Sequence, residues 1–177
     1  MQIALLRGVN VGAARRVAMA DVRRALEQAG FGGVRTLLQS GNVIFEAGAA
    51  SEADLEAEIE SALAQGCGLD CEAMVRTAGA WRAMIAANPF TGAAESDPSQ
   101  LLAHVLKAAP AAGASDALRA AAGEERVRLI GREVLIHYPK GLANSKLVGA
   151  VLDRALGARG TGRNWNTVRR LAELADA

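Results

Sequence analysis

The chain has 177 residues, of which 51% are hydrophobic and 22% are charged. This length allows one domain or two small domains around a substantial core, and this composition excludes a disordered chain. No run approaches the roughly 20 uninterrupted apolar residues of a membrane helix, and Arg7 interrupts the first apolar segment too early for a signal sequence. We therefore expect a cytoplasmic protein with no membrane-spanning segment.

The net charge of +1 is unevenly distributed along the chain. Residues 1–45 and residues 140–177 each carry a net charge of +4, so the middle carries −7. If the two basic ends fold onto one face, they form a surface for an anionic ligand. The alternative is that these charges lie on separate, solvated helix faces.

The first half of the chain predicts the element order βαββαβ. A short apolar strand at 3–6 precedes a helix whose apolar residues recur at helical spacing from Met19. A hairpin over 34–46 follows, and Ser51 begins a second helix with Asp54 completing its cap. Residues 71–76 end the pattern as a strand. This order is ferredoxin-like, so we predict a first subdomain over residues 1–76.

The second half, residues 77–177, predicts a similar order that stops early. Thr77 caps a helix whose Trp81 we expect in the core, residues 91–100 form a linker, and a strand, a helix at 114–122 and a hairpin at Gly131 follow. Two helices then complete the chain, at 144–156, with Val148 and Val151 buried, and at 165–175. The predicted fold class is therefore α+β, with two ferredoxin-like subdomains, the second incomplete and extended by C-terminal helices.

The sequence contains none of the strong catalytic or nucleotide-binding motifs, and it indicates no cofactor. Cys67 and Cys71 have no partner pair for a zinc site, so we expect reduced, structural cysteines and no metal. His104 and His137 fall in predicted strands without a neighbouring nucleophile. The acidic run at 52–60 is interpreted as a solvated helix face.

Three stretches share a chemical character: RGVNVG at 7–12, GLANSK at 141–146 and TGRNWNT at 161–167. Each combines Gly, Asn and a basic residue where a strand ends or a helix begins, and main-chain N–H groups there can hold an oxyanion. For each stretch the alternative is structural: a tight glycine loop for the first, and helix capping by Asn144 or Ser145 for the second. We predict these ligand-binding residues: Arg7, Gly8, Asn10, Gly12, Ser145, Lys146, Arg163, Asn164, Asn166 and Thr167.

Trp165 lies in the third stretch, and two interpretations of its role remain open. With Asn164 as the N-cap, Trp165 shares a helical face with Val168, so the indole anchors the last helix to the protein. Packing does not account for the donors around it, and a rigid helix start would hold them in place for a ligand. We hypothesise that Arg7, Asn10, Arg163 and Asn166 line one cleft with Lys146 at its margin.

Several segments in order, LLRGVNVG, MADVRRALEQAGF, VRTLLQSGNVIFE, NPF, SKL and TGRNWNTVRRL, together resemble the bacterial domain-of-unknown-function 1697 family. This resemblance runs from the first predicted strand to the last helix. It implies two α+β subdomains of ferredoxin-like character, and it implies no activity, cofactor or catalytic residue.

Three functions remain open from the sequence. The best supported is a binding module for a phosphate-containing anion, either a nucleotide or a nucleic acid. The second is an enzyme that acts on a small phosphorylated or carboxylated substrate, although no general base or nucleophile is evident. The third is a homo-oligomeric structural protein. The six aromatic residues are few for a sequence-specific RNA reader, which stacks bases on such side chains.

Overall fold

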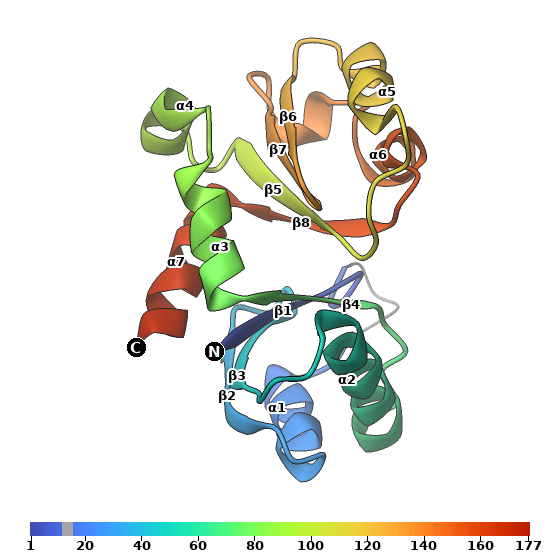
Figure 1. The fold of residues 1–177 in the computed structure, drawn as a ribbon, viewed down its shortest axis with the longest axis vertical. Helices are drawn as coiled ribbons and strands as arrows, with labels where there is room; N and C mark the ends of the chain where they lie inside the picture. Colours follow the sequence, from blue (N-terminus) through green and yellow to red (C-terminus); the bar gives the residue numbers. More distant parts are fainter. Residues whose placement is uncertain (12–15) are drawn as a thin grey trace. The chain divides into compact units, whose positions relative to one another are not determined.

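The computed structural model describes residues 1–11 and 16–177 and contains two compact units, each built on a four-stranded antiparallel sheet (Figure 1). The first unit comprises Met1–Arg82 and Leu171–Ala177, and the second comprises Ala83–Arg170. The strand orders are β2-β3-β1-β4 and β6-β7-β5-β8, so the two units repeat one topology. The predicted α+β class with two ferredoxin-like subdomains is confirmed. The last residues, Leu171–Ala177, belong to the first unit. The predicted division after residue 76 stays a prediction.

The first unit has the predicted order βαββαβ. Its elements are β1 Gln2–Leu6, α1 Met19–Gln28, β2 Gly32–Leu37, β3 Asn42–Glu46, α2 Glu52–Cys67 and β4 Ala73–Thr77. Ser51 caps α2 as predicted, since its hydroxyl oxygen accepts a 3.1 Å hydrogen bond from the Asp54 N–H.

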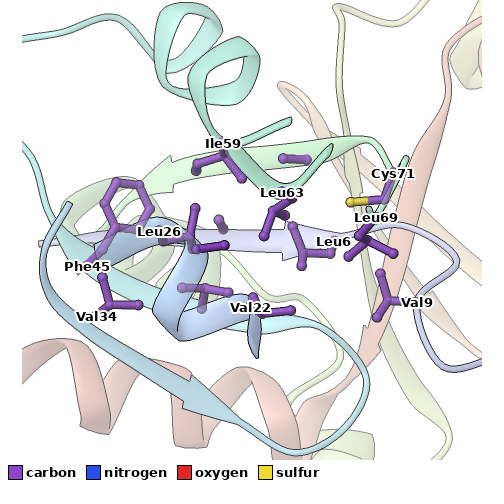
Figure 2. Close-up of a cluster of buried hydrophobic side chains, with 14 of the residues drawn as sticks. Leu6, Val9, Val22, Leu26, Val34, Phe45, Ile59, Leu63, Leu69 and Cys71 are labelled. Carbon is purple, nitrogen blue, oxygen red and sulfur yellow. The ribbon is translucent and has the colours of Figure 1, made fainter. Parts of the chain in front are cut away.

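The core of the first unit lies between its sheet and the helices α1 and α2. Figure 2 shows Val22 and Leu26 from α1, and Ile59 and Leu63 from α2, directed toward the side chains of the strands. Phe45, on β3, is fully buried and meets Phe31 edge to face, with 5.1 Å between ring centroids. The helical spacing of these apolar residues therefore places both helices on one face of the sheet.

The acidic side of α2 has a structural role that the sequence interpretation missed. Glu56 is buried and accepts a 3.0 Å hydrogen bond from the Val75 N–H, and Glu60 accepts a 2.8 Å bond from the Ala73 N–H. Both N–H groups belong to β4, an edge strand, whose outer main-chain groups would otherwise lack partners. The prediction that this acidic run is only a solvated face is therefore wrong: Glu56 and Glu60 cover a sheet edge.

The second unit also completes the βαββαβ order, so the prediction of an incomplete copy is wrong. Its sheet elements and helices are β5 Leu101–Leu106, α5 Ala114–Ala121, β6 Arg126–Ile130, β7 Glu133–His137, α6 Gly149–Leu156 and β8 Gly160–Asn164, with a short 3-10 helix at Leu142–Asn144. The difference is β8, which lies between the two predicted C-terminal helices, where the sequence analysis predicts no strand.

Two glycines explain why β8 was missed and why it forms. A Cβ on Gly160 would lie 2.4 Å from His104 Nε2 and 2.7 Å from the Val105 carbonyl oxygen, and a Cβ on Gly162 would lie 2.5 Å from Leu102 Cδ2. Glycine normally weakens a strand, but here it lets β8 approach β5 closely. The side chains and main chain of the neighbouring strand β5 therefore require glycine at these two positions.

The core of the second unit lies between its sheet and α5 and α6, and includes Leu118, Ile136 and Leu152. Val148 and Val151 are 37% and 40% exposed, so their predicted burial is wrong. Here α6 begins only at Gly149, five residues later than predicted, and presents a different face to the core.

Three further helices complete the chain: α3 Ala78–Ala86, α4 Thr91–Ser96 and α7 Trp165–Asp176. Thr77 caps α3 as predicted, and Trp81 is 1% exposed, which confirms that it is a core residue. The α4 helix replaces the first part of the predicted linker. Among the described residues no helix is long and apolar enough to cross a membrane.

Candidate functional site

The second unit has a pocket of about 400 Å³ between the end of α5 and the segment that follows β7. One wall is the turn from α5 into β6, which contains Glu124 and Glu125. The other wall runs from Tyr138 to Leu147 and includes the predicted ligand-binding residues Ser145 and Lys146. This volume is in the range that small-molecule sites occupy.

The pocket carries both signs of charge. The Lys140 ammonium lies 2.5 Å from a Glu124 carboxylate oxygen. The Ser145 hydroxyl donates a short hydrogen bond to the Glu125 carboxylate, and this bond lowers the Glu125 pKa from its ordinary value. Glu125 is therefore an anion at neutral pH, and the two walls are joined by one ion pair and one hydrogen bond.

Lys140 and Lys146 are both exposed cations of this pocket, and they differ in their partners. The Lys146 ammonium makes no ion pair or hydrogen bond with any residue that the structure describes. By contrast, the buried Tyr138 hydroxyl donates to the Leu147 carbonyl oxygen at 2.9 Å. Burial also raises the Tyr138 pKa, so this phenol stays protonated and supports the wall.

The capping role considered for Asn144 and Ser145 does not occur. Val148 is the N-cap of α6 and makes no side-chain cap. The Asn144 amide instead donates to the Lys140 carbonyl oxygen at 2.7 Å, and the Ser145 hydroxyl oxygen accepts from the Leu147 N–H at 2.9 Å. Both side chains therefore shape the loop that forms the pocket wall.

The TGRNWNT stretch contains the end of β8 and the start of α7. The Asn164 side-chain oxygen accepts from the Thr167 N–H at 3.0 Å and from its hydroxyl at 3.1 Å, which confirms Asn164 as the N-cap. Trp165 is 2% exposed, which confirms the anchoring interpretation, and Asn166 is exposed.

Arg163 is a buried cation. It is 7% exposed, and its guanidinium donates to the Thr161 hydroxyl and to the Gly162 carbonyl oxygen, each at 2.8 Å. Burial lowers its pKa to about 10, so it remains charged at neutral pH. These contacts hold β8 together, and the guanidinium is shielded from solvent.

The RGVNVG stretch lies in the first unit, after β1. Arg7 is 3.7 Å from a Glu72 carboxylate oxygen, and Gly8 has a φ of +69°. The Asn10 amide donates to the carbonyl oxygens of Val17 and Gln39, at 3.0 and 2.7 Å, and accepts from the Val17 N–H at 2.9 Å. Asn10 therefore joins Val17 and Gln39 through three hydrogen bonds. The predicted Gly12 lies outside the described residues.

The predicted residues fall into two groups, one in each unit. Arg7, Gly8 and Asn10 belong to the first unit, and all the others that the structure describes belong to the second. The hypothesis of one shared cleft therefore stays a prediction. Within the second unit, the pocket and Asn164 both lie at the end of the sheet where β5 begins, because Gln100 bonds Tyr138 and Leu102 pairs with Asn164.

Charge also differs between the units. The second unit has twelve Lys or Arg residues against seven Asp or Glu, a net +5, whereas the first has eight against twelve, a net −4. The two basic chain ends seen in the sequence therefore do not describe the distribution in the fold. An anion is attracted to the second unit.

Of the residues that line the pocket, the sequence analysis predicted only Ser145 and Lys146 as ligand-binding residues. Glu124, Glu125 and Lys140 were not predicted, although the EE pair directly before a strand and the PKG turn after one are visible signals. Their contacts across the pocket join residues sixteen and twenty positions apart in the sequence, which no local pattern reveals. Among the described residues, no group of three metal-ligating side chains could hold a metal ion.

The fold and the pocket define a class: a two-unit α+β protein whose basic unit carries a small polar pocket. The sequence profile of the family described as "Protein of unknown function (DUF1697)" matches residues 1–135, and the chain belongs to this family.

A solved structure shares the fold. "The structure of conserved bacterial protein SP0830 from Streptococcus pneumoniae" aligns with a TM-score of 0.76 at 18% sequence identity, over 99% of this chain and 98% of that chain. No curated protein matches this sequence. At this identity the likeness concerns the fold alone.

Proposed function

We propose that the protein is a binding module for a small ligand that carries both a phosphate and hydroxyl groups, such as a nucleotide or a sugar phosphate. The ligand occupies the pocket between the α5–β6 turn and residues 138–147. The observation that carries this proposal is the lining itself, in which Lys146 and Lys140 face Glu124 and Glu125 around about 400 Å³.

Each pair of charges has a distinct role in this proposal. Lys146 has no competing partner among the described residues, so its ammonium is available for a phosphate. Glu124 and Glu125 repel a phosphate, but an ionised carboxylate accepts hydrogen bonds from ligand hydroxyls, as it does from ribose in dinucleotide sites. The net charge of +5 on this unit favours the approach of an anion.

The same lining favours a small ligand over a polyanion. Two carboxylates in the wall oppose the passage of a phosphate backbone, and five of the six aromatic side chains are buried, while the sixth, Phe31, packs against Phe45. A nucleic-acid reader requires exposed rings for base stacking. The enzyme alternative gains no support, because the lowered pKa of Glu125 makes it a weak base toward Ser145.

A thermal-shift experiment on the full chain tests the proposal. Nucleoside phosphates, sugar phosphates, inorganic phosphate and short single-stranded oligonucleotides are added separately. A ligand at a hundred times its Kd stabilises the folded state by about 2.7 kcal/mol and so raises the Tm. We expect a clear rise with a nucleoside or sugar phosphate and a smaller one with inorganic phosphate.

Matched variants test whether the rise in Tm depends on binding in the pocket. Lys146→Ala should remove the rise and leave the Tm of the free protein unchanged, because this side chain has no bonded partner among the described residues. Arg169→Ala removes one exposed charge from the same unit outside the pocket and should keep the rise. An undiminished rise in Lys146→Ala, or no rise with any phosphate compound, would contradict the proposal.

A further inference from the structure

β6 presents an uncovered strand edge at the end of the second sheet. It pairs with β7 at five consecutive positions, from Arg126 opposite His137 to Ile130 opposite Glu133, with no register shift. Its other side has no strand neighbour, because β6 ends the order β6-β7-β5-β8. A regular edge of this kind is a template for another strand.

The hydrogen-bond register identifies the outward main-chain groups. The Tyr138 N–H donates to the Gln100 carbonyl oxygen, and the Leu106 N–H donates to the Arg132 carbonyl oxygen, both at 2.9 Å. Even-numbered residues of β7 therefore bond toward β5, and its odd-numbered residues bond toward β6. It follows that the N–H and C=O groups of Val127 and Leu129 point away from the sheet.

These outward groups make no hydrogen bond with the described part of the chain. Two other sheet edges are protected: Glu56 and Glu60 bond the outer N–H groups of β4, and β2 is interrupted by a register shift between Gly32 and Arg35. The β6 edge carries neither device. It is therefore available to an added strand.

Helix α5 neighbours β6 in this unit (Figure 1), and residues of both elements line a groove. It has a volume of about 250 Å³ and is lined by Ser115, Leu118, Arg119, Val127, Arg128 and Leu129. Leu118 is buried at its base, and Val127 and Leu129 are half-buried. The groove therefore has a mainly polar exposed lining, in which Arg119 and Arg128 lie beside the half-buried aliphatic side chains of Val127 and Leu129.

The charges on β6 indicate which kind of segment can pair with this edge. Arg126 and Arg128 are both exposed and alternate with Val127 and Leu129, which pack toward the core of this unit. Arg126 lies over the Phe90 ring at 5.0 Å, whereas Arg128 makes no ion pair with a described residue. A second copy of β6 would bring like charges together, which opposes pairing between copies.

We propose that the β6 edge binds an extended segment of a partner protein in which acidic and aliphatic residues alternate. The segment adds a fifth strand to this sheet, with main-chain hydrogen bonds to Val127 and Leu129. Because side chains alternate between the faces of a sheet, its aliphatic residues lie beside Val127 and Leu129, and its acidic residues lie beside Arg126 and Arg128. This surface is separate from the proposed phosphate pocket.

The first experiment measures binding of a fluorescent peptide of alternating Glu and Val to the full-length protein. The control peptides are a block peptide of the same composition and a peptide of alternating Lys and Val. We expect only the alternating Glu peptide to bind. Arg128→Glu should weaken it by about tenfold or more, whereas Arg154→Glu, an equal charge change on α6, should leave the Kd within about twofold.

The second experiment tests strand addition directly. Bound peptide should slow hydrogen exchange at the Val127 and Leu129 amides, which are solvent-facing in the free protein. Peptides N-methylated at one set of alternate residues should lose binding, and peptides methylated at the other set should retain it, because only alternate amides face β6. Equal binding of the block peptide, unchanged exchange at Val127 and Leu129, or equal tolerance of both methylation patterns would overturn the proposal.

Discussion

Asn164 and Asn166 stand two residues apart and have opposite roles. The Asn164 side chain accepts hydrogen bonds from both the main chain and the hydroxyl of Thr167, and so defines where α7 begins. The Asn166 side chain is exposed and makes no bond with a described residue. Residue type alone does not separate them, whereas position relative to the helix start does.

We expect Asn164→Ala to lower the free energy of unfolding by about 1 kcal/mol, the usual cost of losing an N-cap. Urea denaturation measures this loss. Asn166→Ala is the matched control and should change stability by less than about 0.5 kcal/mol. Equal losses in the two variants would show that the cap is not what stabilises α7.

The Ser145 hydroxyl gives Glu125 a measurable signature, because its hydrogen bond lowers the Glu125 pKa. A depressed carboxyl pKa stabilises the fold above the unfolded-state pKa, and this stabilisation disappears as the pH falls through the folded-state pKa. We expect Ser145→Ala to raise the Glu125 pKa. Carboxyl NMR measures this pKa in the parent and in the variant. The stability difference between Ser145→Ala and the parent should shrink in acid, and a pH-independent difference would contradict this account.

At the scale of elements, the edge strands β4 and β6 differ in whether side chains cover their outer main-chain groups. The carboxylates of Glu56 and Glu60 on α2 cover the edge of β4, so a helix supplies the acceptors that a neighbouring strand would supply. The β6 edge has no such cover and carries exposed arginines instead. Cationic side chains on an edge discourage pairing between copies.

Glu56→Ala tests the covered edge. It leaves the Val75 N–H without this acceptor and should reduce the free energy of unfolding by about 1–3 kcal/mol. Hydrogen exchange at Val75 should accelerate as well. The control is Glu58→Ala, which removes an exposed carboxylate from the same helix and should hardly change the free energy of unfolding. If Glu58→Ala lowered the free energy of unfolding as much as Glu56→Ala, the loss would come from the charge of the helix and not from the hydrogen bond to Val75.

At the scale of the whole molecule, net charge is divided between units of opposite sign, +5 and −4. The basic unit has the charge that attracts an anion, and we propose that the two carboxylates in its pocket wall limit which anions enter. The six aromatic side chains offer no exposed platform for bases. These features together favour a compact phosphate ester as the ligand.

We therefore expect a nucleoside or sugar phosphate to bind more tightly than a single-stranded oligonucleotide. Binding of a nucleic acid depends steeply on salt, because it releases condensed counterions, whereas one phosphate contact produces a shallow dependence. Titration at several salt concentrations distinguishes the two. Tight oligonucleotide binding with a steep salt dependence would favour the nucleic-acid alternative over the proposed small ligand.

The sequence by itself determined the features that depend on neighbouring residues. Apolar spacing predicted α1 and α2, and the caps at Ser51, Thr77 and Asn164 were each correct. The hairpin at Gly131 was also correct, since the turn requires positive φ at that residue and its φ is +58°. These signals extend over a few residues, so periodicity and turn chemistry are sufficient to read them.

Only the tertiary structure decided what depends on distant residues. β8 can pair closely with β5 because Gly160 and Gly162 have no side chains, which would collide with His104 and Leu102. Glu56 is buried because β4 lies beside α2, although its acidic neighbour Glu58 is exposed. The pocket exists because residues 123–125 and 138–147 meet in the fold. Their side chains become partners only when the packed sheet brings the two segments together. The local sequence of either segment does not indicate that the other lies nearby.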